Sequence, residues 1–321
     1  MRSILSVVLV FMMVALSFGL SGCFFNQEQG TGLTLSDPAV TTPTIATPGV
    51  LRVGVDSSHG PFAGIVDGKI VGIDRDIAAA VAERLGLRLE LIDIANQDPT
   101  QMLAEGTVDI VMGVKKSNEV SPQNGLIGPY IVDGPAIFVI NQSGVPQPLD
   151  PATLNGQTIV TKADTRAAWQ AQQAYGSENV IELELAPNEI APIFDQLKSG
   201  EVTYAAVDAV SGSHIAAVNY DDIVCAAFLA DKDGVYPEGV YMAVRPDNTE
   251  LANKVTQALQ GMRDGGELTV IVSKWLGPVS TSVLTGKQAI ESHTVTPELG
   301  GATSGGTDTG ADPNAAPNSL Q

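Results

Sequence analysis

Asp56 and His59 are the residues whose types and spacing come nearest to an acid–base pair. They lie three positions apart in the segment DSSHGP, which its Gly and Pro mark as a loop. An imidazole beside a carboxylate, or beside Lys115, can exchange protons near neutral pH. Catalysis needs such a pair within reach of one substrate atom. Adjacency in a loop does not supply that, so we predict no catalytic residue and no enzyme activity.

The cysteine and histidine content excludes other chemistry. The chain has two cysteines and three histidines, which are too few for a structural zinc site. If Cys23 is modified, Cys225 has no partner for a disulfide. Cys225 lies in the apolar run 223–228, where a small buried hydrophobic residue is expected. We predict no metal site.

Cofactor fingerprints are missing from the sequence. No G-x-G-x-x-G motif follows the first expected strand, and no G-x-x-x-x-G-K-[ST] phosphate loop or G-x-S-x-G nucleophile turn occurs. We therefore predict no bound cofactor.

An uncharged apolar run follows Arg2 at the beginning of the chain. It covers residues 4–19, which is short for a membrane span of about 20 residues but fits a secretory signal. The run ends at LSGC, which resembles the bacterial lipobox, whose cleavage leaves a diacylated cysteine as the first residue. We expect residues 1–22 to be a lipoprotein signal peptide and Cys23 to carry acyl chains such as palmitate, which together hold a protein on a membrane. An ordinary signal peptide with a chance cysteine is the alternative.

Size and charge limit the partners. The chain has 321 residues, enough for one large domain or two smaller lobes, and a net charge of −19. Such an acidic chain would repel the phosphates of nucleic acid. We expect an exported monomer that is lipid-anchored to the cell membrane, in the periplasm or at the outer cell surface.

Both ends of the mature chain have the composition of spacers. Residues 23–49 are rich in Thr, Pro and Gly, and we expect a flexible tether there. A C-terminal extension should begin at residue 278 and be disordered from about residue 293. Such segments bury too little apolar surface to offset the entropy of ordering. The folded body should run from about Val50 to Gly277.

Strand-like and helix-like stretches alternate within the body. A helix is expected over 74–86, where Ile73, Ile77 and Val81 recur at helical spacing and Asp74 can cap the start. This alternation predicts an α/β fold with mostly parallel strands in two successive lobes, and a cleft between them for a small ligand. The other expected elements are strands at 51–55, 69–72, 87–94, 108–114, 157–161, 180–185 and 204–207 and helices at 100–105, 165–175 and 189–199.

Five segments carry a family resemblance: LRVGVDSSHGPF, GKIVGIDRDIAAAVAERLGL, MLAEGTVDIVMGV, LKSGEVTYAAVDA and LQGMRDGGELTVIVSKWLG. In this order they resemble the bacterial extracellular solute-binding proteins of family 3, the polar amino-acid receptors of ABC importers. The resemblance spans residues 51–277. It implies a two-lobed periplasmic-binding-protein type II fold that closes over its ligand by a hinge, in a form that a permease recognises.

The family pattern also implies where the lobes begin and end. Lobe 1 is expected at about residues 50–138 and 244–277, and lobe 2 at about 139–243. The chain would pass between the lobes near 135–140 and near 239–244.

Two residues of lobe 2, Asp208 and Thr165, match ligand-binding positions of the family. Asp208 stands where an aspartate at a strand end binds the ligand's amine by a charge-assisted bond; a strand-end Asp facing water is the alternative. Thr165 matches a threonine at the start of helix 165–175, where free N–H groups can hold an anion. Arg166, in the first turn, is unfavourable to the helix dipole. That favours a ligand role, although a solvated Arg fits equally well.

The expected carboxylate clamp departs from the family. Val120 stands at the position of an arginine that binds the ligand's carboxylate in the family. A lysine does not reproduce a bidentate guanidinium, but Lys115 or Lys116 could supply positive charge, unless both are loop lysines in solvent. Ser117 of the same segment is also expected in the site.

Lobe 1 departs from the family at two aromatic positions, which His59 and Asn96 occupy here. Phe62 keeps its family place but could equally belong to the core. The complete predicted ligand site is Asp56, His59, Phe62, Asn96, Lys115, Ser117, Thr165, Arg166 and Asp208.

The predicted function is that of an ABC-importer receptor. It would bind a small polar organic solute, an amino acid or a similar molecule, and present it to the permease transmembrane subunits. The altered clamp leaves two alternatives open. One is a sensory or degenerate lipoprotein without a transport role, and the other is a cleft enzyme of the dehydratase type.

Overall fold

The computed structural model describes residues 36–116, 125–145, 147, 149–187, 189–229 and 237–285, with side chains omitted at 151 and 152. The chain divides into two units after Leu35, and the described residues belong to the unit that begins at Ser36. Cys23, Ser117 and Val120 lie outside the described residues, as does the chain from residue 293 on.

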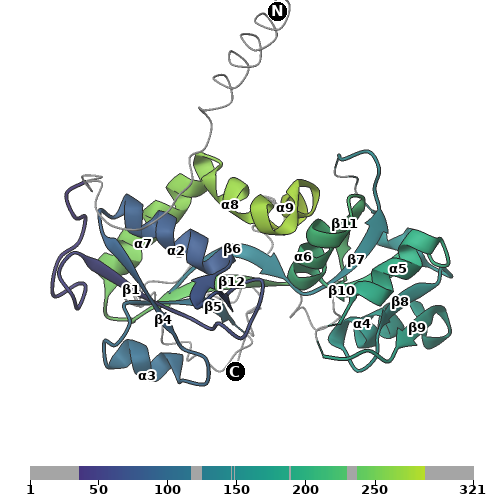
Figure 1. The fold of residues 1–321 in the computed structure, drawn as a ribbon, viewed down its shortest axis with the longest axis horizontal. Coiled ribbons are helices and arrows are strands. Elements are labelled where there is room, and N and C mark those ends of the chain that lie inside the picture. Colours follow the sequence, from purple (N-terminus) through teal and green to yellow (C-terminus); the bar gives the residue numbers. More distant parts are fainter. Residues whose placement is uncertain are drawn as a thin grey trace, which may run out of the picture. The chain divides into compact units, whose positions relative to one another are not determined.

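The first sheet has five strands in the order β4-β1-β5-β12-β6 (Figure 1). Strand β1 pairs parallel with β4 and β5, whereas β12 pairs antiparallel with β5 and β6. A small hairpin of β2 and β3 stands apart from it. The strands are β1 (Val50–Val55), β2 (Gly64–Val66), β3 (Lys69–Val71), β4 (Arg88–Asp93), β5 (Ile110–Lys115), β6 (Gly125–Asp133) and β12 (Glu238–Val244).

The second sheet has five strands in the order β11-β7-β10-β8-β9. Strands β8, β9 and β10 run parallel, and β7 is antiparallel to β10 and β11. The predicted α/β fold class is confirmed. The strands are β7 (Pro135–Ile140), β8 (Ile159–Lys162), β9 (Val180–Leu183), β10 (Tyr204–Asp208) and β11 (Ile223–Phe228).

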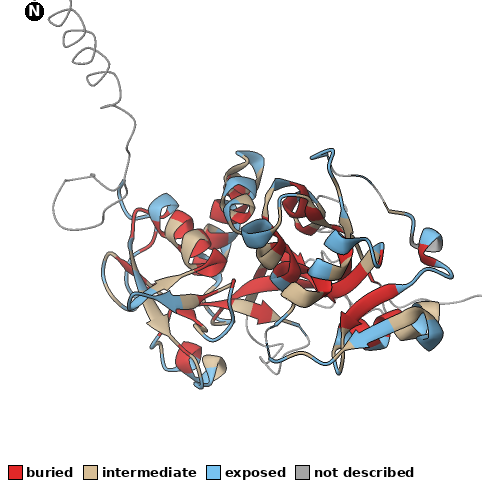
Figure 2. Ribbon diagram, turned by 45° about the vertical axis from the view of Figure 1, so that its right-hand side comes forward, coloured by how far each residue is buried: buried red, intermediate tan, exposed pale blue. Residues whose placement is uncertain are grey.

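Helices pack on both sheets, and the buried residues concentrate on the strands and on the helix faces turned to them (Figure 2). The helices α2 (Ile73–Arg84), α3 (Pro99–Ala104) and α7 (Thr249–Asp264) pack on the first sheet, and α4 (Arg166–Tyr175), α5 (Ala191–Ser199) and α6 (Ala209–Asn219) pack on the second. Helix α8 (Glu267–Leu276) packs on α2 and α7, with which we group it, and it also contacts α6. We call these two assemblies lobe 1 and lobe 2. Two short 3-10 turns, η1 (Pro151–Leu154) and η2 (Ser177–Asn179), complete lobe 2. Among the described residues, no helix is both long and apolar enough to cross a membrane.

The chain passes from lobe 1 to lobe 2 at Gly134, between β6 and β7. Gly134 has φ 147°, a conformation that favours glycine. Residues 135–138 were expected in lobe 1, but the whole of β7 pairs with β10 and β11 in the second sheet. In the same way, residues 238–243 were expected in lobe 2, but β12 pairs in the first sheet from Glu238 onward. The remaining lobe limits stay a prediction.

Residues 36–49 correct the expected tether, because this stretch packs on lobe 1. Val40 and Ile45 are buried in its core. The Ala46 N–H donates to Asp109 Oδ1 (3.1 Å), and Asn248 Nδ2 donates to the Thr44 carbonyl (2.7 Å). The burial of these two aliphatic side chains stabilises the packed segment, although its Thr- and Pro-rich composition is typical of a spacer.

The C-terminal extension begins with a helix, α9 (Pro278–Leu284), whose buried face includes Val279 and Leu284. It contacts β6 of lobe 1 and β11 of lobe 2. Ser280 Oγ accepts a hydrogen bond from the Cys225 N–H (3.1 Å). Cys225 is buried, as predicted.

Helix α2 confirms the predicted spacing but corrects its first turn. Ile73, Ile77 and Val81 are buried. Asp74 does not cap the helix, which begins one residue earlier with Gly72 at the N-cap and no side-chain cap. A Cβ at Gly72 would lie 2.2 Å from the Phe62 carbonyl oxygen. Glycine therefore lets the loop after β1 approach α2, and this contact carries Asp74 into the interior.

Candidate functional site

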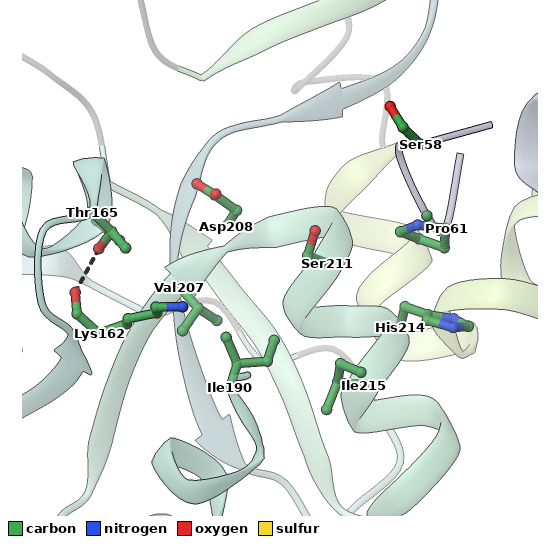
Figure 3. Close-up of a pocket in the computed structure, with 12 residues that line it drawn as sticks. Ser58, Pro61, Lys162, Thr165, Ile190, Val207, Asp208, Ser211, His214 and Ile215 are labelled. Carbon is green, nitrogen blue, oxygen red and sulfur yellow. Dashed lines mark hydrogen bonds between the residues drawn. The ribbon is translucent and has the colours of Figure 1, made fainter. Parts of the chain in front are cut away.

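Two neighbouring cavities lie between residues of the two lobes. The larger, about 450 Å³, is lined mainly by lobe 2 and is called the lobe-2 cavity (Figure 3). The other, about 340 Å³, is lined mainly by lobe 1 and is called the lobe-1 cavity. Both are lined by Gly60, Asp208 and Ser211, so they meet at these residues. The lobe-2 cavity is further lined by Ser58, Pro61, Lys162, Thr165, Ala167, Ile190, Val207, His214 and Ile215, and the lobe-1 cavity by Asp56, His59, Phe62, Asp74, Met112, Gly113, Lys115, Asp133 and Val240.

Asp208 stands at the junction of the cavities because β10 ends there and α6 begins at the next residue. An aspartate in this N-cap position usually accepts hydrogen bonds from its own helix. Asp208 does not, and no hydrogen bond or ion pair reaches its carboxylate within the described part of the chain. Its side chain is exposed to the cavities. A carboxylate without a partner in such a place can bind a cation.

Asp133 of lobe 1 supplies the cap that Asp208 does not provide. Its Oδ1 accepts from the Val210 N–H in the first turn of α6 (3.1 Å), and its Oδ2 accepts from Lys115 Nζ (2.8 Å). Asp133 is the last residue of β6, directly before the passage into lobe 2. One buried carboxylate therefore joins lobe 1 to the helix that carries the junction and leaves Asp208 free.

Desolvation and the neighbouring charges shift the pKa of Asp208. Removal of water raises it, and the negative charge of Asp133 raises it further, against the positive charges of Lys115 and Arg166; the result is a pKa of about 6. Burial alone would lower the pKa of Lys115, but the carboxylates of Asp133, Glu238 and Asp208 outweigh it and raise that pKa. Lys115 therefore stays an ammonium and Asp208 is ionised at neutral pH.

Asp74 is a further carboxylate that lines the lobe-1 cavity, one that the sequence did not reveal as part of the site. It is 2% exposed, and its Oδ1 accepts from the Tyr130 hydroxyl (2.6 Å), which itself accepts from the Gly113 N–H (2.9 Å). Desolvation raises the pKa of Asp74 to about 7, against the hydrogen bond from Tyr130. Asp74 therefore titrates near neutral pH.

The loop after β1 carries Asp56 and His59, as predicted. Asp56 Oδ2 and His59 Nδ1 are 2.9 Å apart, and the Ser58 hydroxyl donates to Asp56 Oδ1 (2.6 Å). The partial burial of Asp56 would raise its pKa, but the bonds from Ser58 and the charge of His59 outweigh this and lower it. The His59 side chain is 72% exposed, so the pair forms part of the cavity rim.

Thr165 and Arg166 begin α4. Thr165 Oγ1 accepts from the Ala168 N–H (3.2 Å), donates to the Lys162 carbonyl (2.7 Å) and lines the lobe-2 cavity. Arg166 lines neither cavity, and its charge acts on Asp208. The hydroxyl of Thr165 is thus used to begin the helix.

Phe62 and Asn96 differ in their positions. Phe62 lines the lobe-1 cavity and also packs against the core, so its position fits both a ligand-site residue and a core residue. Asn96 is exposed after β4 with φ 64° and lines neither cavity. Lys116 Nζ lies 5.3 Å from the centre of the Tyr241 ring, and it too is absent from the cavity walls. The ligand roles of these residues remain predictions.

Sequence reasoning missed several lining residues of α6, including Ser211, His214 and Ile215. Asp208, Ser211 and Ile215 follow one another at intervals of three and four, the spacing of one helix face. That signal was present, but the helix after β10 was not predicted. Asp133 carried no local signal, because its partners lie far away along the chain.

A family model named "bacterial extracellular solute-binding proteins, family 3" matches residues 51–278. The arginine-binding extracellular protein ArtP of Bacillus subtilis (strain 168) is 25% identical over 229 residues, covering 70% of this chain and 85% of the relative. The membrane-bound lytic murein transglycosylase F of Enterobacter sp. (strain 638) is 24% identical over 229 residues, which cover 66% of this chain and 40% of that protein.

Among solved structures, the chain resembles a substrate-binding protein of a polar amino acid ABC uptake transporter from Streptococcus thermophilus. The TM-score is 0.61 at 20% identity, with 75% of this chain and 89% of the other covered. That likeness concerns the fold alone, which is the two-lobed type II periplasmic-binding-protein fold. Because the family model spans both sheets and every element that lines the two cavities, this chain belongs to the bacterial extracellular solute-binding proteins of family 3.

Proposed function

We propose that this protein is a receptor for a small organic amine, an amino acid or a similar molecule, and that Asp208 binds the ammonium group. The observation that carries the proposal is the unpartnered carboxylate at the junction of the two cavities, left free because Asp133 caps α6. A charge-assisted bond to an ammonium is about twice as strong as one between neutral groups.

The charges around the junction support a cationic group in the ligand. The lobe-1 cavity is lined by the carboxylates of Asp56, Asp74, Asp133 and Asp208 and by the ammonium of Lys115. This ammonium already donates to Asp133. The other hydrogens of that ammonium can still bind a ligand carboxylate, although without the planar geometry of the absent arginine.

The transport role is part of the same proposal. The receptor would pass its solute to an ABC permease, and the lipid on Cys23 would hold it at the outer side of the cell membrane. Membership of an extracellular solute-binding family supports this.

We propose binding without chemical conversion. The match to the transglycosylase covers 40% of that protein, so it transfers no activity to this chain. The His59 side chain of the Asp56–His59 pair is 72% exposed, so a proton-transfer pair there lacks a dry and ordered substrate site.

A thermal-shift screen tests the proposal. The panel pairs amino acids and simple amines with their N-acetylated forms, which lack the ammonium. A ligand at a hundred times its dissociation constant should stabilise the protein by about 2.7 kcal/mol, and acetylation should abolish the shift. Equal shifts with both forms, or none with any amine, would refute an amine receptor.

A further inference from the structure

The lobe-2 cavity is larger than an ammonium at Asp208 requires. It extends from the junction along α6 and the start of α5, with a volume of about 450 Å³. The walls of the lobe-2 cavity differ in chemical character from those of the charged lobe-1 cavity, which lies on the other side of Asp208.

Most polar side chains of the lobe-2 cavity already have protein partners. Lys162 Nζ donates to the Ala186 carbonyl, and His214 Nδ1 lies 3.0 Å from the Trp275 carbonyl oxygen. The hydroxyls of Thr165 and Ser58 donate to other protein atoms. Within the described part of the chain, Asp208 and Ser211 are the lining side chains whose polar atoms have no such partner. Both stand at the junction.

The remaining wall is aliphatic. Ile190, Val207 and Ile215 gather on one side of the cavity, while the oxygens of Asp208 and Ser211 lie on the other (Figure 3). The side chains of Ile190 and Ile215 are half-buried. One side of each packs against the core, and the other side is left uncovered at the cavity. An uncovered aliphatic surface next to a free carboxylate suits a molecule with an ammonium at one end and hydrocarbon at the other.

We propose that the lobe-2 cavity is a subsite for a hydrophobic substituent of the bound amine. The solute would then be an amine or amino acid with an unbranched or lightly branched hydrocarbon side chain. Its ammonium binds Asp208, and its hydrocarbon lies against Ile190, Val207 and Ile215. This inference rests on the proposed function, because Asp208 fixes the end from which the side chain extends.

A series of ligands of increasing length tests the subsite. The probes are L-alanine, L-2-aminobutyrate, L-norvaline and L-norleucine, with their C-terminal amides in case a carboxylate is not tolerated. Isothermal titration of the full chain should show affinity rising with each methylene, by up to about fourfold per step. L-lysine, which carries an ammonium at the end of the same carbon chain, should bind more weakly than L-norleucine.

Variants locate the effect. Ile215→Ala should weaken the binding of L-norleucine at least fivefold and leave that of L-alanine unchanged, and Ile190→Ala provides the same test at the residue that precedes α5. Ile181→Ala, at an exposed position of β9, is the matched control and should change neither affinity. The inference is overturned if affinity does not depend on length, or if L-lysine binds more tightly and Ile215→Ala has no effect.

The outcomes separate the two proposals. If L-alanine binds and Asp208→Asn abolishes that binding, but longer side chains bring no gain, the amine site stands and the hydrophobic subsite fails. If no amine in the series binds, both fail.

Discussion

Asp208 combines a raised pKa with the absence of any partner in the described protein, and this combination has a cost for stability. The pKa rises from 3.8 to about 6 on folding, so between these values the folded state holds a proton that the unfolded chain releases. The contribution of this group to the free energy of unfolding therefore falls as pH rises through that window. At neutral pH the ionised carboxylate destabilises the folded state. A free carboxylate of this kind is expected where a ligand supplies the missing charge.

Asp208→Asn should accordingly stabilise the ligand-free protein at pH 7 to 8. The gain should be of order 1 kcal/mol, discounted for the solvent exposure of the side chain, and should vanish by about pH 4. Thermal unfolding at several pH values measures it. Asp221→Asn, at an exposed position of the same lobe, is the control; a loss of stability on changing Asp208 would contradict the assignment.

At the scale of elements, Asp133 links the end of β6 to the start of α6. Asp133→Asn removes the negative charge opposite Lys115, whose side chain is 25% exposed against 9% for Asp133. The free energy of unfolding measured in urea should fall by about 1–3 kcal/mol, because the lysine is left without its charged partner.

The exposed pair Arg245–Asp247 provides the matched control for Asp133. Its atoms lie 3.0 Å apart in solvent, and Asp247→Asn should cost less than about 0.5 kcal/mol. Equal effects of the two changes would mean that Asp133 does not hold α6 in place.

The elements also show what the sequence could predict. Periodicity predicted α2 and the strand that ends on Asp208, because both carry a regular local pattern. It did not predict that Asp74 is buried, since that follows from the approach of the Phe62 carbonyl to Gly72. Asp133 was missed for a similar reason, as its partners Lys115 and Val210 meet it only in the folded chain.

At the scale of the whole molecule, composition misjudged where the body begins. Residues 36–49 read as a spacer, but Val40 and Ile45 anchor them in the core of lobe 1. A chain that begins at residue 49 should unfold at lower urea than one that begins at residue 36. The difference should be roughly 3 kcal/mol or more, from the two aliphatic side chains. Identical midpoints would show that the segment does not contribute.

The central claim, that an ammonium binds at Asp208, is tested most directly by the affinity for an amine hit as a function of pH. Below pH about 6, protonation of Asp208 should weaken binding up to tenfold per pH unit. Asp133, Lys115 and Arg166 act on this carboxylate, and Asp74 titrates nearby with a pKa of about 7. Titration calorimetry of the wild-type protein and Asp208→Asn from pH 4.5 to 7.5 isolates the contribution of Asp208. We predict at least tenfold weaker binding by the variant at pH 7 and loss of the steep fall below pH 6; a variant that binds like the wild type at every pH would contradict the account.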